Sequence, residues 1–247
     1  MRTGNPALNQ SVFQRSMVDA DTEVMTLSGT INKSFTLIIL VLAGAGITWW
    51  QFFNGSDLLQ IFMIGGAIGG LIIAIVTSFN KQRSNVLAPI YAILEGFFLG
   101  GLSAYVEANF YQGIVMQAVG LTVGVFIGLL LAYKSGWIKV TQNFRLGVFA
   151  ATAGIGLLYL VSFLMSMFGF GSIGFIHESG LIGIGFSLFV VVIAALNLVL
   201  DFDFIEEGVE QGAPKYMEWY GAFGLMVTLV WLYLEILRLL SKLQSRN

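Results

Sequence analysis

Seven apolar stretches of about 20 residues each constrain the fold of this chain more than any other feature. A helix of about 20 residues, rising about 1.5 Å per residue, crosses the roughly 30 Å hydrocarbon core of a bilayer. Hydrophobic residues make up 57% of the 247 residues and charged residues only 11%, which is not the composition of a soluble domain. The predicted spans are 35–53, 58–79, 86–106, 114–133, 146–168, 181–200 and 220–240. We therefore predict an all-α polytopic membrane protein with seven transmembrane helices.

The predicted spans leave a polar segment at each end of the chain. Residues 1–33 mix acidic and basic side chains, and residues 242–247 are short and polar. No small-residue cleavage site follows the first apolar stretch, which argues against a removed signal peptide. We expect three parts: a polar cytoplasmic N-terminal tail (1–33), a seven-helix transmembrane domain (34–241) and a short C-terminal tail (242–247).

Glycines recur at helical spacing inside the spans. The pairs and series that fall on one helical face are Gly65 and Gly69, Gly66 and Gly70, Gly96 and Gly100, and Gly120, Gly124 and Gly128. Small residues on one face let two helix backbones approach closely within a membrane. We predict that these faces are packing surfaces between helices.

Basic residues in the predicted loops set the orientation. The loops after the second, fourth and sixth spans hold Lys81, Arg83, Lys134, Lys139, Arg145 and Lys215, whereas the loops after the first, third and fifth spans hold none. The positive-inside rule then places the N-terminus in the cytoplasm. Seven crossings put the C-terminus outside, although Arg238, Lys242 and Arg246 would favour the inside. The last helix is either a full crossing, which we favour, or re-entrant.

Ionisable residues are costly in hydrocarbon, so those inside or at the ends of spans are candidates for pathways and binding sites. Glu95 lies near the middle of the third span and is either functional or a neutral structural hydrogen-bonding group. Asp201 and Asp203 end the sixth span, and at about 100° per residue their side chains point about 200° apart. Asp201 shares its face with Asn197 and is the better candidate for an inward-facing ligand. The alternative is that both aspartates are solvated at the membrane boundary.

Two acids near the last span have simpler explanations. Glu235 lies three residues before Arg238, which predicts an ion pair within the helix. Glu218 lies near the start of the last span, and we expect it at the membrane interface.

The residue inventory argues against catalysis and against nucleic-acid binding. The chain has no Cys and a single His, which excludes Cys-ligated metal centres and thiol chemistry. His177-Glu178 begins like a zinc-protease signature, but Leu181 stands where a second His is required. Basic residues are scattered singly and the formal charge is -2. We expect no enzyme, no cofactor and no nucleic-acid partner.

Three segments carry a resemblance to a known family. Residues 200–216 read LDFDFIEEGVEQGAPKY and precede an apolar last helix that ends in LRLL at 237–240. Residues 95–100 read EGFFLG, and residues 5–9 read NPALN. Together with the seven spans, these segments resemble the Bax inhibitor-1 family, and in particular its bacterial YccA-like members.

The resemblance implies a fold in which the last helix is central among the other six, and a pH-sensitive calcium leak controlled by two aspartates. Asp201 matches the first aspartate. The stretch that corresponds to the second, residues 225–229, reads LMVTL, with Thr228 or Met226 near the expected position. The resemblance also implies a bacterial inner membrane.

Two carboxyls in a site of low dielectric constant share a proton and hold helices together until pH rises or a cation displaces the proton. With Asp201 alone, the partner would be Asp203 after local unwinding, Glu95 across the bundle, or Asn197 as a neutral ligand. The candidate metal ligands are thus Asp201 and Asp203, and the candidate gating or pathway residues are Asp201, Asn197, Glu95 and Thr228.

Three functions are compatible with these observations. The first is a passive, pH-sensitive cation leak, with calcium as the permeant ion and the lipid bilayer as its surroundings. The second is a non-conducting membrane interaction protein that regulates a membrane protease or another membrane partner. The third is a proton-coupled transporter, for which inverted repeats are expected but no convincing halves are visible.

Overall fold

The computed structural model describes residues 23–171 and 173–246, and it contains seven long helices within these ranges. They are α2 (Leu27–Phe53), α3 (Leu59–Phe79), α4 (Ser84–Asn109), α5 (Ile114–Lys134), α6 (Gln142–Met167), α8 (Leu181–Glu210) and α9 (Met217–Ser245). Each is long and apolar enough to cross a membrane. The short helix η2 (Lys81–Arg83) precedes α4, and α7 (Gly174–His177) lies between α6 and α8. The prediction of an all-helical protein with seven spans is confirmed.

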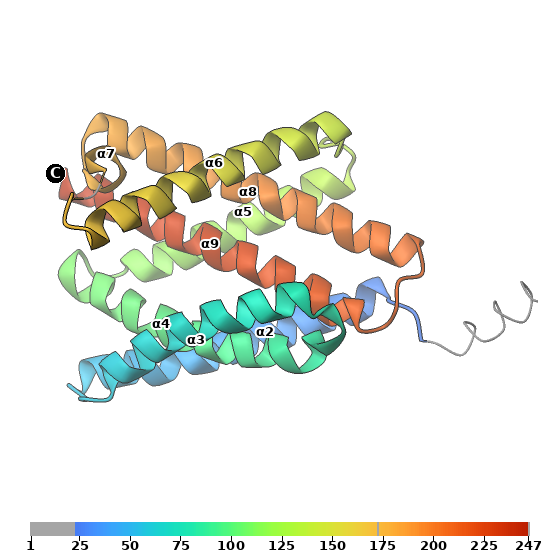
Figure 1. The fold of residues 1–247 in the computed structure, drawn as a ribbon, viewed down its shortest axis with the longest axis horizontal. Helices are drawn as coiled ribbons and strands as arrows, with labels where there is room; N and C mark the ends of the chain where they lie inside the picture. The colour runs from blue at the N-terminus through green and yellow to red at the C-terminus, as the bar shows by residue number, and fades with distance from the viewer. Residues whose placement is uncertain (1–22, 172, 247) are drawn as a thin grey trace, which may run out of the picture.

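The long helices run along the long axis of the molecule (Figure 1). The start of α2 and the α3–α4, α5–α6 and α8–α9 connections lie at one end of the bundle. The end of α9 and the remaining connections lie at the opposite end. The last helix therefore runs the full length of the bundle, as expected for a full crossing.

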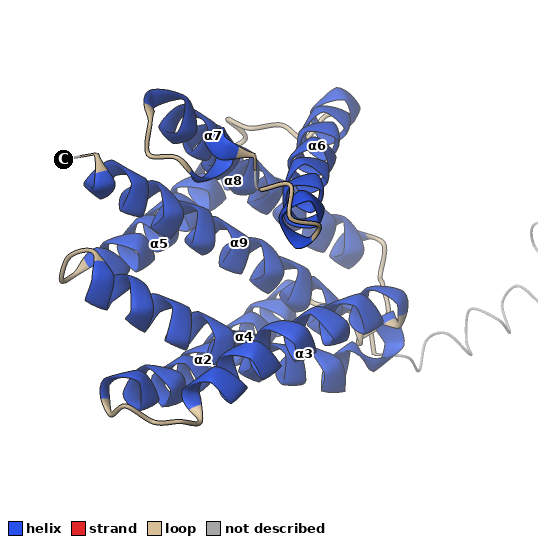
Figure 2. Cartoon of the chain, turned by 60° about the vertical axis from the view of Figure 1, so that its left-hand side comes forward, coloured by secondary structure: helices blue, strands red, loops and turns tan. Residues whose placement is uncertain are grey.

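Helix α9 links the parts of the bundle. Figure 2 shows α2, α3 and α4 gathered on one side of α9, and α6, α7 and α8 on the other. Helix α9 packs against α2, α4, α5 and α8. Its residues enter one apolar cluster with α2 and α4 and another with α5 and α8, and its Trp231 packs against a third cluster, between α6 and α8. That α9 is surrounded by all six other helices stays a prediction.

Glycines allow a close contact between α2 and α4. A Cβ atom added at Gly44 would lie 2.7 Å from the Ile93 carbonyl oxygen, and one added at Gly96 would meet the backbone of Val41 and Gly44. Gly66 of α3 meets the backbone of α4 in the same way. The predicted packing faces of Gly66 with Gly70 and of Gly96 with Gly100 are thus observed. The predicted face of Gly65 with Gly69 is not, because a Cβ atom added at Gly65 would meet nothing within 4 Å.

The glycine series on α5 behaves differently, and that prediction is wrong. A Cβ atom added at Gly120, Gly124 or Gly128 would meet nothing within 4 Å, since this face of α5 has no neighbouring helix in the described chain. Spacing alone therefore does not identify a packing face.

Helix α2 begins eight residues before the apolar stretch that predicted it. Thr26 is its N-cap, and the Thr26 hydroxyl accepts a hydrogen bond from the Gly29 amide at 3.0 Å. Residues 1–22 of the predicted N-terminal tail lie outside the described residues. At the other end of the chain, α9 continues to Ser245, through most of the predicted C-terminal tail.

The tight α2–α4 contact predicts different effects on stability for two matched substitutions. Gly96→Ala should lower the free energy of unfolding by about 1–3 kcal/mol, because the new methyl group must displace the α2 backbone. Gly120→Ala should leave stability unchanged or raise it by up to about 1 kcal/mol, because alanine favours helix and the site is open. Unfolding titrations of the two variants in detergent measure both effects. Equal stabilities would contradict the observed close packing.

Candidate functional site

A pocket of about 380 Å³ lies between α3, α8 and α9. Six of its ten lining residues belong to α9, two to α3 and two to α8. Most of its lining is apolar, and its polar side chains are Ser78, Asp201, Tyr220 and Thr228. The full lining is Ala74, Ser78, Asp201, Phe204, Tyr220, Gly221, Phe223, Gly224, Val227 and Thr228. Asp201 is the only carboxyl among these residues.

The Asp201 carboxyl has an unusual environment. Its Oδ2 atom is buried and has no hydrogen-bond partner among the described residues. The Thr228 hydroxyl, from α9, interacts with the same carboxyl, and that hydroxyl also donates to the Gly224 carbonyl at 3.3 Å. Buried carboxylate oxygens are nearly always hydrogen-bonded, so a bare one that faces a pocket marks a candidate site for a proton or a cation.

Asp203 lies on a different face of α8. Its carboxylate pairs with Arg145 of α6, whose guanidinium also contacts Glu207 at 3.1 Å. Because α8 remains helical through Glu210, the two aspartates point apart as the helical repeat requires. The structure therefore does not bring Asp203 to the Asp201 pocket.

Asn197 and Glu95 are not among the residues that line the pocket. The Asn197 side-chain amide donates to the Thr152 hydroxyl of α6 and to the Ile193 carbonyl, both at 2.8 Å. Glu95 lies at the α3–α4 interface, where a Cβ atom added at Gly70 would lie 2.9 Å from its Oε2 atom. Of the predicted gating residues, the structure joins Asp201 and Thr228. Within the described ranges, no three Asp, Glu, His or Cys side chains form a group that could hold a metal ion.

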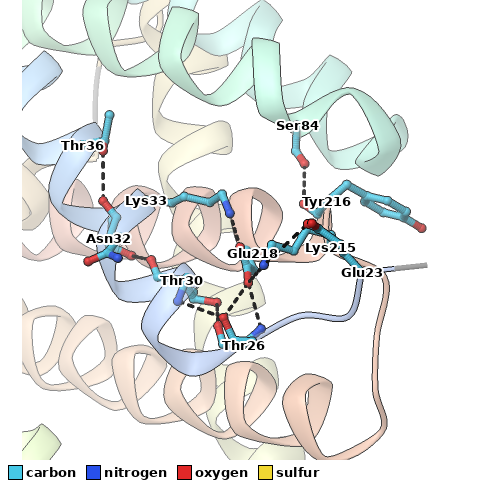
Figure 3. Close-up of polar contacts among 12 residues, drawn as sticks. Glu23, Thr26, Thr30, Asn32, Lys33, Thr36, Ser84, Lys215, Tyr216 and Glu218 are labelled. Carbon is cyan, nitrogen blue, oxygen red and sulfur yellow. Dashed lines mark hydrogen bonds and ion pairs between the residues drawn. The ribbon is translucent and has the colours of Figure 1, made fainter. Parts of the chain in front are cut away.

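A second polar cluster, around Glu218, ties the start of α2 to the start of α9 (Figure 3). The Glu218 side chain is fully buried. It accepts hydrogen bonds from the Thr26 amide and hydroxyl, both at 2.8 Å, and forms ion pairs with Lys33 and, at 3.3 Å, with Lys215. Glu218, which we expected at the membrane interface, is thus buried, and its hydrogen bonds and ion pairs form a junction between α2 and α9. In the sequence, only the three-residue spacing of Lys215 and Glu218 indicates this cluster.

The backbone strengthens this junction. The Met25 amide donates to the Ala213 carbonyl at 2.7 Å, and the Lys215 amide donates to the Glu23 carbonyl at 2.9 Å. Met25 is 2% exposed. The segment before α2 is therefore fixed to the α8–α9 connection.

The opposite end of α9 holds two further polar groups. Glu235 pairs with Arg238 at 3.1 Å, which confirms the predicted ion pair, and both side chains contact the Tyr159 hydroxyl of α6. Lys242, assigned from sequence to a tail, is buried. Its ammonium donates to the Ile176 and Gly183 carbonyls at 2.7 and 3.0 Å and to the Ser187 hydroxyl at 2.8 Å. Its acceptors come from α7 and α8, and hydropathy alone does not predict such contacts.

These features define a multi-pass helical membrane protein with a partly unsatisfied carboxyl in a pocket between three helices. The sequence model of the Bax inhibitor 1 like family matches residues 5–245, so the chain belongs to this family. No curated protein matches the chain.

The Glu218 junction predicts a large loss of stability in one variant. Glu218→Gln removes the charge that compensates Lys33 and should lower the free energy of unfolding by about 2 kcal/mol. Glu210→Gln, at an exposed position on α8, is the matched control and should change stability by less than about 0.5 kcal/mol. Unfolding titrations in detergent measure both. Similar values for the two variants would show that the junction does not stabilise the fold.

Proposed function

We propose that this protein is a passive, pH-sensitive cation leak whose control site is the Asp201 pocket, with calcium as the permeant ion. The observation that supports the proposal is the buried Oδ2 atom of Asp201, which lacks a hydrogen-bond partner and borders a pocket. An anionic carboxyl there attracts a cation, whereas the protonated carboxyl does not. Cation passage would therefore depend on pH.

The polar groups of the pocket suit a passing ion better than a tightly held one. Calcium takes six to eight oxygen ligands at its preferred sites. Besides the single carboxyl of Asp201, the pocket lining contains the hydroxyls of Ser78, Tyr220 and Thr228. Water would have to complete the coordination, and conduction needs binding weak enough for the ion to leave.

Family membership and the distribution of basic residues support further parts of the proposal. We propose a bacterial inner membrane, in the YccA-like branch, with a cytoplasmic N-terminus. The end of the bundle where α2 begins also carries the basic residues Lys33, Lys81, Arg83, Lys134 and Lys215, as the positive-inside rule requires of a cytoplasmic face. We also propose that the protein is not an enzyme.

Calcium entry into dye-loaded liposomes that contain the purified protein tests the proposal. Entry should increase from pH 6 to pH 8, because deprotonation of the pocket carboxyl restores its charge. Asp201→Asn should abolish this pH dependence, and Thr228→Val should alter it, because each changes the polar groups of the pocket. Asp201→Asn should remain folded, because it replaces a partly unsatisfied acid with a neutral group of similar size.

Glu210→Gln on the exposed face of α8 is the control and should behave like the unmodified protein. No entry above that of empty liposomes at any pH, with folded and inserted protein, would contradict the leak. It would favour the alternative of a non-conducting protein that regulates a membrane protease or another membrane partner. Entry that is unchanged in Asp201→Asn would instead place the path elsewhere in the bundle.

A further inference from the structure

A second cavity, also of about 380 Å³, forms a groove between α2 and α5, with α4 and α9 as its floor. Its rim consists of residues exposed on the outside of the bundle, namely Leu42, Gly46, Val119 and Val123. Its inner lining includes the buried residues Val41 of α2, Leu99 of α4 and Val230 of α9. The groove thus leads from the lipid-facing surface to the core around α9, and it shares no lining residue with the Asp201 pocket.

The groove offers almost no free hydrogen-bonding group. The Ser103 and Tyr233 hydroxyls bond to each other at 2.6 Å, and the Thr122 hydroxyl donates to the Ala118 carbonyl at 2.8 Å. Cavities lined in this way do not hold water well, because a bound water needs two to four polar partners. The lining therefore fits a hydrocarbon.

The groove has the direction and length of a lipid chain in one leaflet. It begins beside Trp49, near the end of α2, and Val115, near the start of α5, at the end of the bundle where the α2–α3 and α4–α5 connections lie. It reaches Ile38 and Phe126 at its inner end. Trp49 follows Ile38 by eleven positions along α2, which corresponds to a rise of about 16 Å, about half of the roughly 30 Å hydrocarbon core.

We propose that this groove binds one acyl chain of a membrane lipid, with the headgroup at the level of Trp49 and the chain end near Phe126. Tryptophan prefers the headgroup level of a bilayer, which agrees with this orientation. A further helix, about 10–12 Å across, would rest on the rim. The inner lining residues Val41, Leu99 and Val230 keep only 8%, 6% and 7% of their surface exposed, so a narrow, unbranched chain is the occupant that reaches them.

Depth-resolved photolabelling tests the proposal in the full-length protein. The protein is reconstituted with phosphatidylcholine that carries a diazirine either near the carbonyl end or near the terminal methyl group of one chain. After irradiation, peptides are analysed by mass spectrometry. The shallow probe should label residues around Trp49 and Val115, and the deep probe should label residues around Ile38 and Phe126. Labelling in the groove should exceed labelling of the lipid-exposed surface of α6.

A pair of glycine substitutions provides the matched variant and its control. A Cβ atom added at Gly46 or at Gly120 would meet nothing within 4 Å, but only Gly46 lines the groove. Gly46→Phe should reduce groove labelling to the level of the α6 surface, whereas Gly120→Phe should leave it unchanged.

Two results would overturn the proposal. One is labelling spread evenly over the lipid-facing helices without order in depth, and the other is groove labelling that persists in folded Gly46→Phe protein. If Gly46→Phe fails to fold, the comparison of the shallow and deep probes in the unmodified protein still tests the proposal. Neither result depends on ion flux, so the acyl-chain site and the leak can fail separately.

Discussion

The absence of water from the bilayer core is the constraint on which the rest of this structure depends. Backbone and side-chain polar groups there must find partners within the chain. Hydroxyls on several spans meet this need by donating to the carbonyl four residues earlier, as Thr30, Ser34, Thr77 and Thr122 do. The charges of Glu218 and Lys242 are met by groups from other helices. Against this background, the unpartnered oxygen of Asp201 is an exception, and it borders a pocket.

The number and approximate position of the helices could be predicted, because an apolar stretch of about 20 residues has few alternatives to a transmembrane helix. Helix ends were harder to predict. Helix α2 begins at Leu27 because Thr26 caps it and because Lys33 pairs with Glu218, a residue 185 positions away. Helix α8 likewise continues past Asp201 to Glu210, and its acidic end is stabilised by Arg145 of α6. A hydropathy profile reflects the local free-energy cost of placing a charge in hydrocarbon. It does not indicate which distant residue pairs with that charge.

The candidate site could be predicted in part. Asp201 could be predicted as a candidate because it ends an apolar stretch. Helical geometry predicted that its side chain points away from that of Asp203. The resemblance to the family suggested Thr228, which the structure places beside Asp201. Asn197 shares a helical face with Asp201, but a shared face does not fix which neighbour a side chain meets. Its amide bonds to Thr152, and that contact depends on how α6 packs against α8.

Helix α9 connects the two recesses of the molecule. Gly224, Val227 and Thr228 border the Asp201 pocket, while Met226, Leu229 and Val230 border the apolar groove. Adjacent positions on a helix point about 100° apart, so these sets face different neighbours although they interleave in the sequence. Because a helix turns as a rigid unit, a rotation of α9 that repacks one recess must also repack the other. The Asp201 pocket and the apolar groove therefore share α9 as a common lining helix.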